Sequence, residues 1–199
     1  RDVDLSAISQ WRSGGRAELM LCPATASEVA ALIRWFAVRD IQPVVIGKTT
    51  NLLFSDAGLR VPCIQIGSRM SDVNIGQQVH AEAGIGVPAL ARRIMQAGLT
   101  GAEHISGIPG TLGGLICMNG GSQRKSIGTS VLMVHSINSE GKEMLRSRNA
   151  CGFEYRQSVF QGSGEIITSV TLEFERGDRF AIRSEMRKIL AERRSKFPR

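Results

Sequence analysis

The sequence has no feature of a membrane protein or of a metalloprotein. No apolar run approaches the roughly 18 residues that span a bilayer, and the first residues lack the apolar block of a signal peptide. The 4 cysteines, Cys22, Cys63, Cys117 and Cys151, lie too far apart in the chain for zinc-ligand or redox-motif spacing. We therefore expect a cytoplasmic protein with reduced thiols, no membrane contact and no bound metal.

The common nucleotide-binding signatures are also missing. Gly84-Ile85-Gly86 has no third glycine, because Ala89 stands at that position, and no Walker-type run of glycine, lysine and hydroxyl occurs. Aromatic residues make up only 5% of the chain, and no recognised nucleic-acid-reading motif accompanies them. Any nucleotide must therefore be held by another fold, and nucleic acid is not an expected partner.

Glycine is concentrated in one loop. The run Gly107-Ile108-Pro109-Gly110-Thr111-Leu112-Gly113-Gly114 is soon followed by Met118-Asn119-Gly120-Gly121. Glycine lets a backbone pass close to a ligand, and successive N–H groups can form an anion-binding concavity. A second loop, Gly47-Lys48-Thr49-Thr50-Asn51, follows the apolar run at residues 43–46. Two such loops favour a phosphate-rich ligand, most simply a dinucleotide, although glycine alone is equally consistent with ordinary tight turns.

Positive charge is concentrated at the end of the chain. The net charge is +7, and residues 176–199 hold nine Lys or Arg against three Asp or Glu. Apolar residues recur at helical spacing in this segment, namely Ile182, Met186, Ile189, Leu190 and Phe197. We therefore predict a basic helix over residues 179–199, with one face on the protein body and the other in solvent.

The remaining pattern predicts an α+β fold with two lobes, residues 1–75 and residues 76–178. In the first lobe, a capping box at Thr25-Ala26-Ser27-Glu28 starts an amphipathic helix, and strands are predicted over residues 44–46 and 61–66. In the second lobe, Pro88 suits the first turn of a helix. Further strands are predicted over residues 80–83, 131–137, 142–145 and 165–174. Clefts between lobes commonly hold cofactors, so we expect the ligand there.

Six segments resemble, in order, the blocks of one enzyme family. These are Trp11–Gly15, Val45–Asp56, Ala83–Gly86, Gly98–Glu103, Gly107–Asn119 and Phe153–Phe160. Together they are similar to the FAD-binding portion of the UDP-N-acetylenolpyruvoylglucosamine reductases, also called UDP-N-acetylmuramate dehydrogenases. These enzymes belong to peptidoglycan precursor synthesis in cell wall biogenesis.

The resemblance implies a two-lobed FAD-binding domain of the vanillyl-alcohol-oxidase (PCMH-like) type. It implies FAD as cofactor, NADPH as electron donor and a UDP-sugar enolpyruvate as small-molecule substrate. Matching by motif, Arg156 is the arginine that stabilises the developing enolate, a role suited to a fixed guanidinium. The residues expected at the cofactor are Gly47, Lys48, Thr49, Thr50, Asn51, Leu52 and Ser55 in the first loop, and Gly107, Ile108, Pro109, Gly110, Thr111, Gly113, Gly114 and Asn119 in the second.

The match to the family is incomplete. In the family a C-terminal substrate domain follows and supplies a proton-donating serine and a glutamate, whereas this sequence stops near where that domain would begin. We therefore expect the substrate domain to be absent, and complete reductase activity is not expected of this chain alone. Lys48, Arg124 and Lys125 also depart from the family pattern. Lys48 could pair with the pyrophosphate or narrow the site, and Arg124 and Lys125 could face a phosphate or solvent.

Three interpretations are consistent with the sequence. The chain could be the FAD domain of a longer reductase, or a short paralogue with other flavin redox chemistry. It could also be a non-catalytic interaction module that retains the fold and uses its basic helix to bind a partner.

Overall fold

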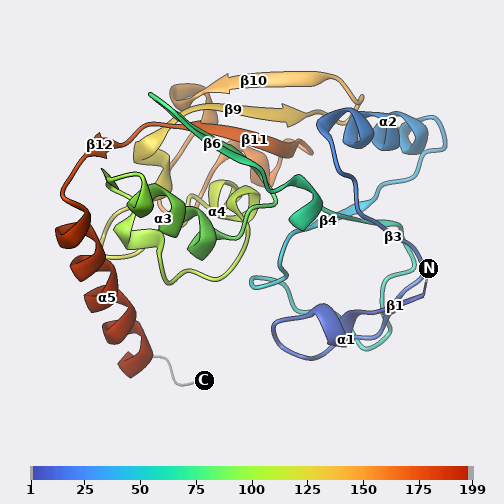
Figure 1. Cartoon of the computed structure of the whole chain (residues 1–199). Helices are drawn as coiled ribbons and strands as arrows, with labels where there is room; N and C mark the ends of the chain where they lie inside the picture. The colour runs from blue at the N-terminus through green and yellow to red at the C-terminus, as the bar shows by residue number, and fades with distance from the viewer. Residues whose placement is uncertain (1, 197–199) are drawn as a thin grey trace.

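The largest sheet has five antiparallel strands, and it forms one layer of the molecule. The computed structural model describes residues 2–196, so Arg1, Phe197, Pro198 and Arg199 lie outside the described residues. The strand order is β10-β9-β11-β7-β6. Their bounds are β6 Val73–Ile75, β7 Val79–Glu82, β9 Val131–Ile137, β10 Glu143–Ser147 and β11 Ile166–Leu172. Figure 1 shows these strands along one side of the molecule, with helices α3 (Val87–Gln96) and α4 (Leu112–Cys117) beneath them.

A smaller parallel sheet carries the first glycine-bearing loop. It has the order β3-β5-β4, with β3 at Met20–Leu21, β5 at Cys63–Gln65 and β4 at Val44–Ile46. Helix α2 (Ala26–Ala37) connects β3 to β4, the two outer strands of this sheet. The predicted N-cap at Thr25 is confirmed, because its side chain accepts from Glu28 N–H. The reciprocal half of the capping box differs, since the Glu28 carboxylate accepts from the N–H of Ala24, one residue before the cap.

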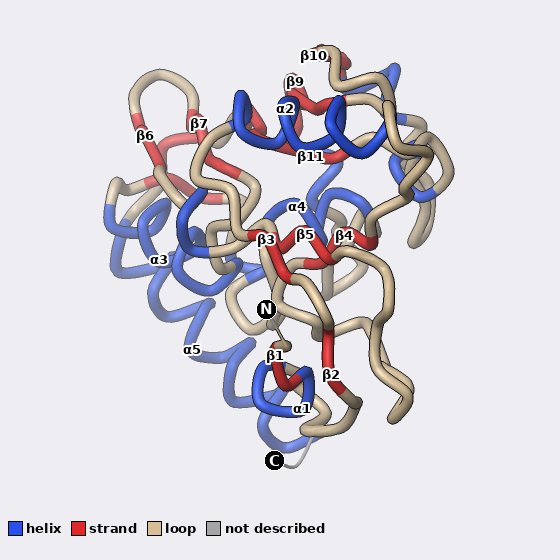
Figure 2. Tube along the Cα trace, turned by 90° about the vertical axis from the view of Figure 1, so that its right-hand side faces the viewer, coloured by secondary structure: helices blue, strands red, loops and turns tan. Residues whose placement is uncertain are grey.

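Two short strand pairs complete the fold. At the N-terminus, β1 (Val3–Asp4), α1 (Leu5–Ile8) and β2 (Arg16–Ala17) form a small unit, which Figure 2 shows below the three-stranded sheet. Further along, β8 (Leu99–Thr100) pairs with β12 (Glu175–Arg176). Short 3₁₀ turns connect the larger elements: η1 Ser68–Met70, η2 Glu103–Ile105, η3 Ile127–Ser130, η4 Arg148–Cys151 and η5 Val159–Gln161.

The predicted basic helix is present as α5, Arg179–Lys196. Ile182 and Ile189 are its buried residues, and Met186 packs against the main core from a half-buried position. The charged side chains lie mainly on the exposed faces, as the sequence pattern indicates. Within residues 2–196, no helix is both long enough and apolar enough to cross a membrane.

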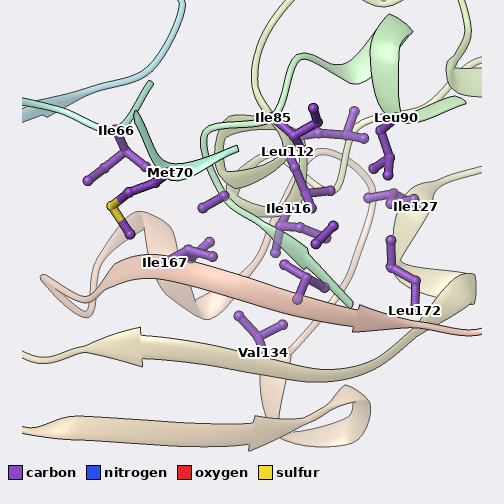
Figure 3. Close-up of a cluster of buried hydrophobic side chains, with 14 of the residues drawn as sticks. Ile66, Met70, Ile85, Leu90, Leu112, Ile116, Ile127, Val134, Ile167 and Leu172 are labelled. Atoms are coloured by element: carbon purple, nitrogen blue, oxygen red, sulfur yellow. The ribbon is translucent and has the colours of Figure 1, made fainter. Parts of the chain in front are cut away.

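One main hydrophobic core joins the elements (Figure 3). Leu112 and Ile116 of α4 lie at its centre, fully buried, between Leu90 of α3 and Val134 of the sheet. The same cluster includes α2 and β5 from the first predicted lobe. Strand β6 pairs with β7, so the five-stranded sheet starts at Val73. The division into lobes at residue 75 stays a prediction.

The core predicts a large cost for shortening Ile116, which is 0% exposed. Ile116→Ala should lower the free energy of unfolding by about 2–5 kcal/mol, because it removes apolar contacts and leaves a cavity. Val38→Ala, at an 85% exposed position, is the control and should change it by no more than about 0.5 kcal/mol. Urea unfolding measures both, and equal values for the two variants would contradict the packing of α4.

Candidate functional site

The first loop is held in a strained conformation by its central threonine. Thr49 follows β4, is 3% exposed and has a φ of 58°, which is rare for a β-branched residue. Its hydroxyl oxygen accepts from the Gln10 N–H at 3.3 Å and lies 3.1 Å from the Ile8 carbonyl. Thr49 therefore ties the loop to the N-terminal unit. Strain of this kind is often found at functional sites.

The two glycine-bearing loops lie against each other. The Thr50 hydroxyl donates to the Pro109 carbonyl at 3.3 Å. A Cβ on Gly47 would overlap the Thr111 hydroxyl, and a Cβ on Gly110 would lie 3.2 Å from the Thr50 hydroxyl. Gly110 also has a φ of 132°, which disfavours any side chain. The close approach of the loops therefore requires glycine on both sides.

Several backbone N–H groups in these loops have no acceptor within residues 2–196. They are those of residues 47–51 in the first loop and of Gly110 and Thr111 in the second. In contrast, Leu112 N–H donates to Ile85 O at 2.9 Å and Gly113 N–H to Ala83 O at 2.8 Å. The Gly114 N–H donates to the Thr111 side chain. The capacity to bind an anion therefore lies in residues 47–51 and at residues 110–111.

Gly113 has a packing role. A Cβ there would lie 3.1 Å from the Ala83 Cβ, so glycine lets α4 pack closely on the end of β7. Gly107 is covered in the same way by α5, because a Cβ there would meet the Arg193 side chain and lie 3.2 Å from Leu190. A direct cofactor contact by Gly107, Gly113 or Gly114 stays a prediction.

Lys48 places a cation beside the two loops. Its ammonium lies 3.5 Å from the position of a Cβ on Gly86, and Gly86 bridges to Thr111 of the second loop. No carboxylate within the described part of the chain forms an ion pair with Lys48. Charge-assisted contacts to an anion are stronger than neutral ones, so this lysine is suited to a phosphate group.

The remaining first-loop residues extend from the junction of the loops. Asn51 and Leu52 are exposed, Leu52 to 39%. Ser55 lies in a further turn, where its carbonyl accepts from Gly15 N–H at 2.9 Å. In the second loop, Ile108 is half-buried and Pro109 is exposed. Roles of Leu52, Ser55 and Ile108 at a cofactor stay predictions.

Asn119 joins the second loop to the turn that carries Arg156. Its side-chain oxygen accepts from Gly128 N–H at 3.0 Å, and its side-chain nitrogen donates to the Glu154 carbonyl at 2.7 Å. Asn119 is 6% exposed. Both ends of the amide are thus engaged inside the protein, and its observed role is to hold this turn.

Arg156 itself is exposed at the tip of the turn. Glu154 and Gln157 close the turn with two backbone hydrogen bonds of 3.1 and 3.2 Å. Arg156 has a φ of 57°, and its Nη1 lies 3.6 Å from the position of a Cβ on Gly120. The guanidinium therefore lies beside the residue that follows Asn119.

Burial keeps two titratable groups near the second loop uncharged. It lowers the pKa of His104, which is 3% exposed and hydrogen-bonded through Nδ1 to Gly101 O. It raises the pKa of the Cys117 thiol at the end of α4. Neither an imidazolium nor a reactive thiolate is therefore expected there near neutral pH.

Sequence reasoning missed two buried polar groups beside the second loop. His104 Nε2 and the Ser106 hydroxyl have no hydrogen-bond partner within residues 2–196. Their only sequence signal is a polar residue on either side of the buried Ile105.

Arg124 and Lys125 are exposed and form no ion pair within the described chain, which favours the solvent-facing interpretation. Two shallow hollows, of about 210 and 380 Å³, lie on other faces and are not lined by the loops.

The sequence matches a known family over most of its length. Residues 17–144 match the family described as FAD binding domain. The chain belongs to this family. It is 38% identical to UDP-N-acetylenolpyruvoylglucosamine reductase 1 of Corynebacterium glutamicum, across 99% of this chain and 59% of that protein. It is 32% identical to the reductase of Carboxydothermus hydrogenoformans, across 98% of this chain and 65% of that protein. The chain therefore spans about three fifths of the length of these relatives.

Solved structures confirm the expected fold class. The reductase MurB from Thermus caldophilus superposes with a TM-score of 0.86 at 25% identity, covering all of this chain and 70% of that one. A solvent-stable cholesterol oxidase gives a TM-score of 0.66 at 20% identity, covering 85% of this chain and 37% of that one, and shows the fold alone. The family resemblance predicted from the sequence motifs is confirmed.

The contact between the loops predicts the effect of a methyl group at Gly47. Gly47→Ala should weaken FAD binding at least about tenfold, equivalent to about 1.4 kcal/mol, because its Cβ displaces Thr111 and opens the paired loops. Gly162→Ala is the matched control, since a Cβ at Gly162 meets nothing within 4 Å. Titration of flavin fluorescence measures both, and wild-type affinity in Gly47→Ala would contradict a site at these loops.

Proposed function

We propose that this chain binds FAD at the paired loops and forms the flavin-carrying part of an oxidoreductase. The observation that carries the proposal is the set of unsatisfied N–H groups in residues 47–51 and 110–111. These donors belong to two loops that touch at Thr50 and Pro109, and Lys48 of the first loop forms no ion pair within residues 2–196. Such an arrangement suits a pyrophosphate, and membership of the FAD-binding domain family supports the same ligand.

Different residues of the chain would then have different roles in binding FAD. The backbone of the first loop and of Gly110 and Thr111 would donate to the pyrophosphate oxygens. Lys48 would balance their charge, and Thr49 would keep the first loop in place. When bound, FAD supplies the capacity to accept and pass on a hydride. Arg156, fixed near the second loop, would stabilise negative charge on a substrate carboxylate.

We extend the proposal to the reaction named for the relatives. A complete protein with this chain as its FAD-binding part would reduce the enolpyruvyl group of a UDP-sugar, with NADPH as electron donor. The support is the similarity to two reductases over nearly the whole of this chain. The chain spans about three fifths of the length of those relatives, so the reaction is proposed for a complete protein and not for this chain alone.

The first test is the visible spectrum of the purified chain, with the released chromophore identified by chromatography. Stoichiometric FAD, either as purified or after addition, supports the proposal. A colourless protein that takes up no added FAD would contradict it, and would favour an interaction module that retains the fold.

A second prediction concerns the charge of Lys48. Lys48→Met should weaken FAD binding about tenfold at low salt. Hydrogen bonds to charged groups contribute about 1.5–3 kcal/mol, and the exposure of Lys48 to solvent places its contribution at the lower end of that range. The difference from wild type should shrink as salt screens the contact. Lys188→Met, on an exposed face of α5, is the control and should bind FAD as wild type does. Calorimetric titration at two salt concentrations decides, and equal affinities for the three proteins would remove Lys48 from the site.

A further inference from the structure

The position of Arg156 depends on the segment of chain between β10 and β11, to which it belongs. Its side chain is exposed, and its turn lies within residues 147–164, which leave the sheet after β10 and return at β11. Strands β10 and β11 are not hydrogen-bonded to each other, because β9 lies between them. Sheet pairing therefore does not join the two ends of the segment directly.

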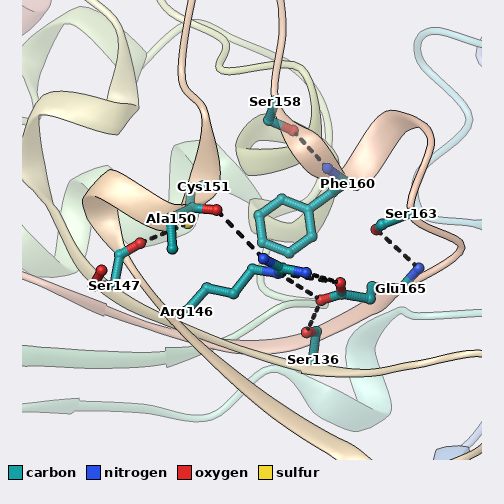
Figure 4. Close-up of polar contacts among 9 residues, drawn as sticks. All are labelled: Ser136, Arg146, Ser147, Ala150, Cys151, Ser158, Phe160, Ser163 and Glu165. Carbon is teal, nitrogen blue, oxygen red and sulfur yellow. Dashed lines mark hydrogen bonds and ion pairs between the residues drawn. The ribbon is translucent and has the colours of Figure 1, made fainter.

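A partly buried ion pair joins these two ends (Figure 4). Arg146, one residue before the end of β10, donates to the carboxylate of Glu165, the residue before β11, through Nε at 3.1 Å and through Nη2. The Glu165 side chain is 4% exposed and the Arg146 side chain 27%. Ser136, on the intervening strand β9, donates to the same carboxylate at 2.6 Å. The pair thus bridges all three strands where the segment begins and ends.

Arg146 favours the charged form of the Glu165 carboxyl. The hydrogen bond from Arg146 is the main cause that lowers the pKa of the Glu165 carboxyl, against the opposing effect of burial. Removing one partner of a buried pair leaves an uncompensated charge, whereas replacing both with apolar groups is often tolerated. Two-point contact between guanidinium and carboxylate also fixes orientation. The pair is therefore a directional link, which an apolar contact would not be.

The far end of the segment is attached to α4. The Ser158 hydroxyl donates to the Cys117 carbonyl at 2.7 Å, and Asn119 holds Glu154. The Gln161 side chain donates to the Arg156 carbonyl at 3.1 Å. Since α4 starts at the second loop and has 6 residues, its length of about 9 Å sets the spacing between that loop and the Arg156 turn.

We propose that Arg146 and Glu165 are positioning residues for Arg156. Their ion pair closes the base of residues 147–164, and the contacts with α4 then hold the Arg156 turn next to the second loop. The inference rests on the proposed function for what Arg156 does, and on the contacts above for how it is held. It assigns no contact with the cofactor to either residue of the pair.

A tyrosine next to Arg156 can serve as a spectroscopic probe of the turn. It contains a single tyrosine, Tyr155, which is 92% exposed and precedes Arg156. Incorporated 3-fluorotyrosine therefore gives one ¹⁹F resonance, from the turn itself. Fluorotryptophan at Trp11 and Trp35, the 2 tryptophans, reports on the rest of the chain.

Glu165→Gln keeps the shape of the side chain and removes its charge. We expect the Tyr155 resonance to change in linewidth and shift as the turn becomes more mobile, and tryptic cleavage after Arg156 to be about fivefold faster or more through local opening. The tryptophan resonances and cleavage after Arg124 should stay as in wild type. Glu140→Gln is the matched control, because it breaks the exposed ion pair with Lys142 at the other end of β10, and it should change none of these signals.

If Glu165→Gln does not fold, the double variant Arg146→Met/Glu165→Met replaces it, since it removes the link without leaving a lone buried charge. An unchanged Tyr155 resonance and an unchanged cleavage rate after Arg156 would overturn the proposal. Tryptophan resonances that shift together with Tyr155 would also overturn it, because the pair would then support the whole fold.

These measurements use no flavin. They therefore decide the proposal even if the chain fails to bind FAD. If the chain does bind FAD, affinity in the variant should stay within about twofold of wild type, because residues 47–51 and 110–111 do not contact the pair. A larger loss of affinity would contradict a role confined to Arg156.

Discussion

Close packing of α4 against the end of β7 is the constraint on which the site depends. A Cβ on Gly113 would lie in a tight contact of 3.1 Å with the Ala83 Cβ, and the Gly113 N–H donates to the Ala83 carbonyl. Leu112 and Ile116 fill the core below. Once α4 is fixed in this way, the loop before it meets the first glycine-bearing loop, and the residues after it hold the Arg156 turn. A short buried helix thus sets the relation between the two parts of the candidate site.

The site combines strain with unsatisfied donors. Thr49, Asn119 and Arg156 all adopt positive φ without being glycine, and such residues persist only where surrounding contacts hold them. Thr49 and Asn119 have those contacts through their side chains, whereas Arg156 is held through its neighbours. The N–H groups of residues 47–51, in the loop around Thr49, have no acceptor within residues 2–196. A folded loop with this many free donors is organised for an anion before any ligand arrives.

Much of this arrangement could be predicted from the sequence. The capping box at Thr25 predicted the start of α2, the apolar spacing from Ile182 to Ile189 predicted the buried stripe of α5, and the ordered motifs predicted the family. Each of these signals is local, because it depends on residues within one turn, one strand or one motif. Gly113 and Gly114 show the limit of such reasoning. Both glycines are as visible in the sequence as Gly110, yet the Gly114 N–H donates to the Thr111 side chain and the Gly113 N–H to the Ala83 carbonyl. Only the position of β7 shows the second of these contacts.

The sequence by itself determined that the chain has an α+β fold with two glycine-bearing loops, since backbone freedom and hydrophobic spacing are properties of neighbouring residues. Only the tertiary structure decided which N–H groups remain free, that Asn119 binds Glu154, and that Arg146 meets Glu165 across β9. Residues 146 and 165 lie far apart in the sequence, and an arginine and a glutamate at such a separation carry no pattern of their own. Their meeting depends on sheet register, because β9 brings β10 and β11 within reach of one side chain.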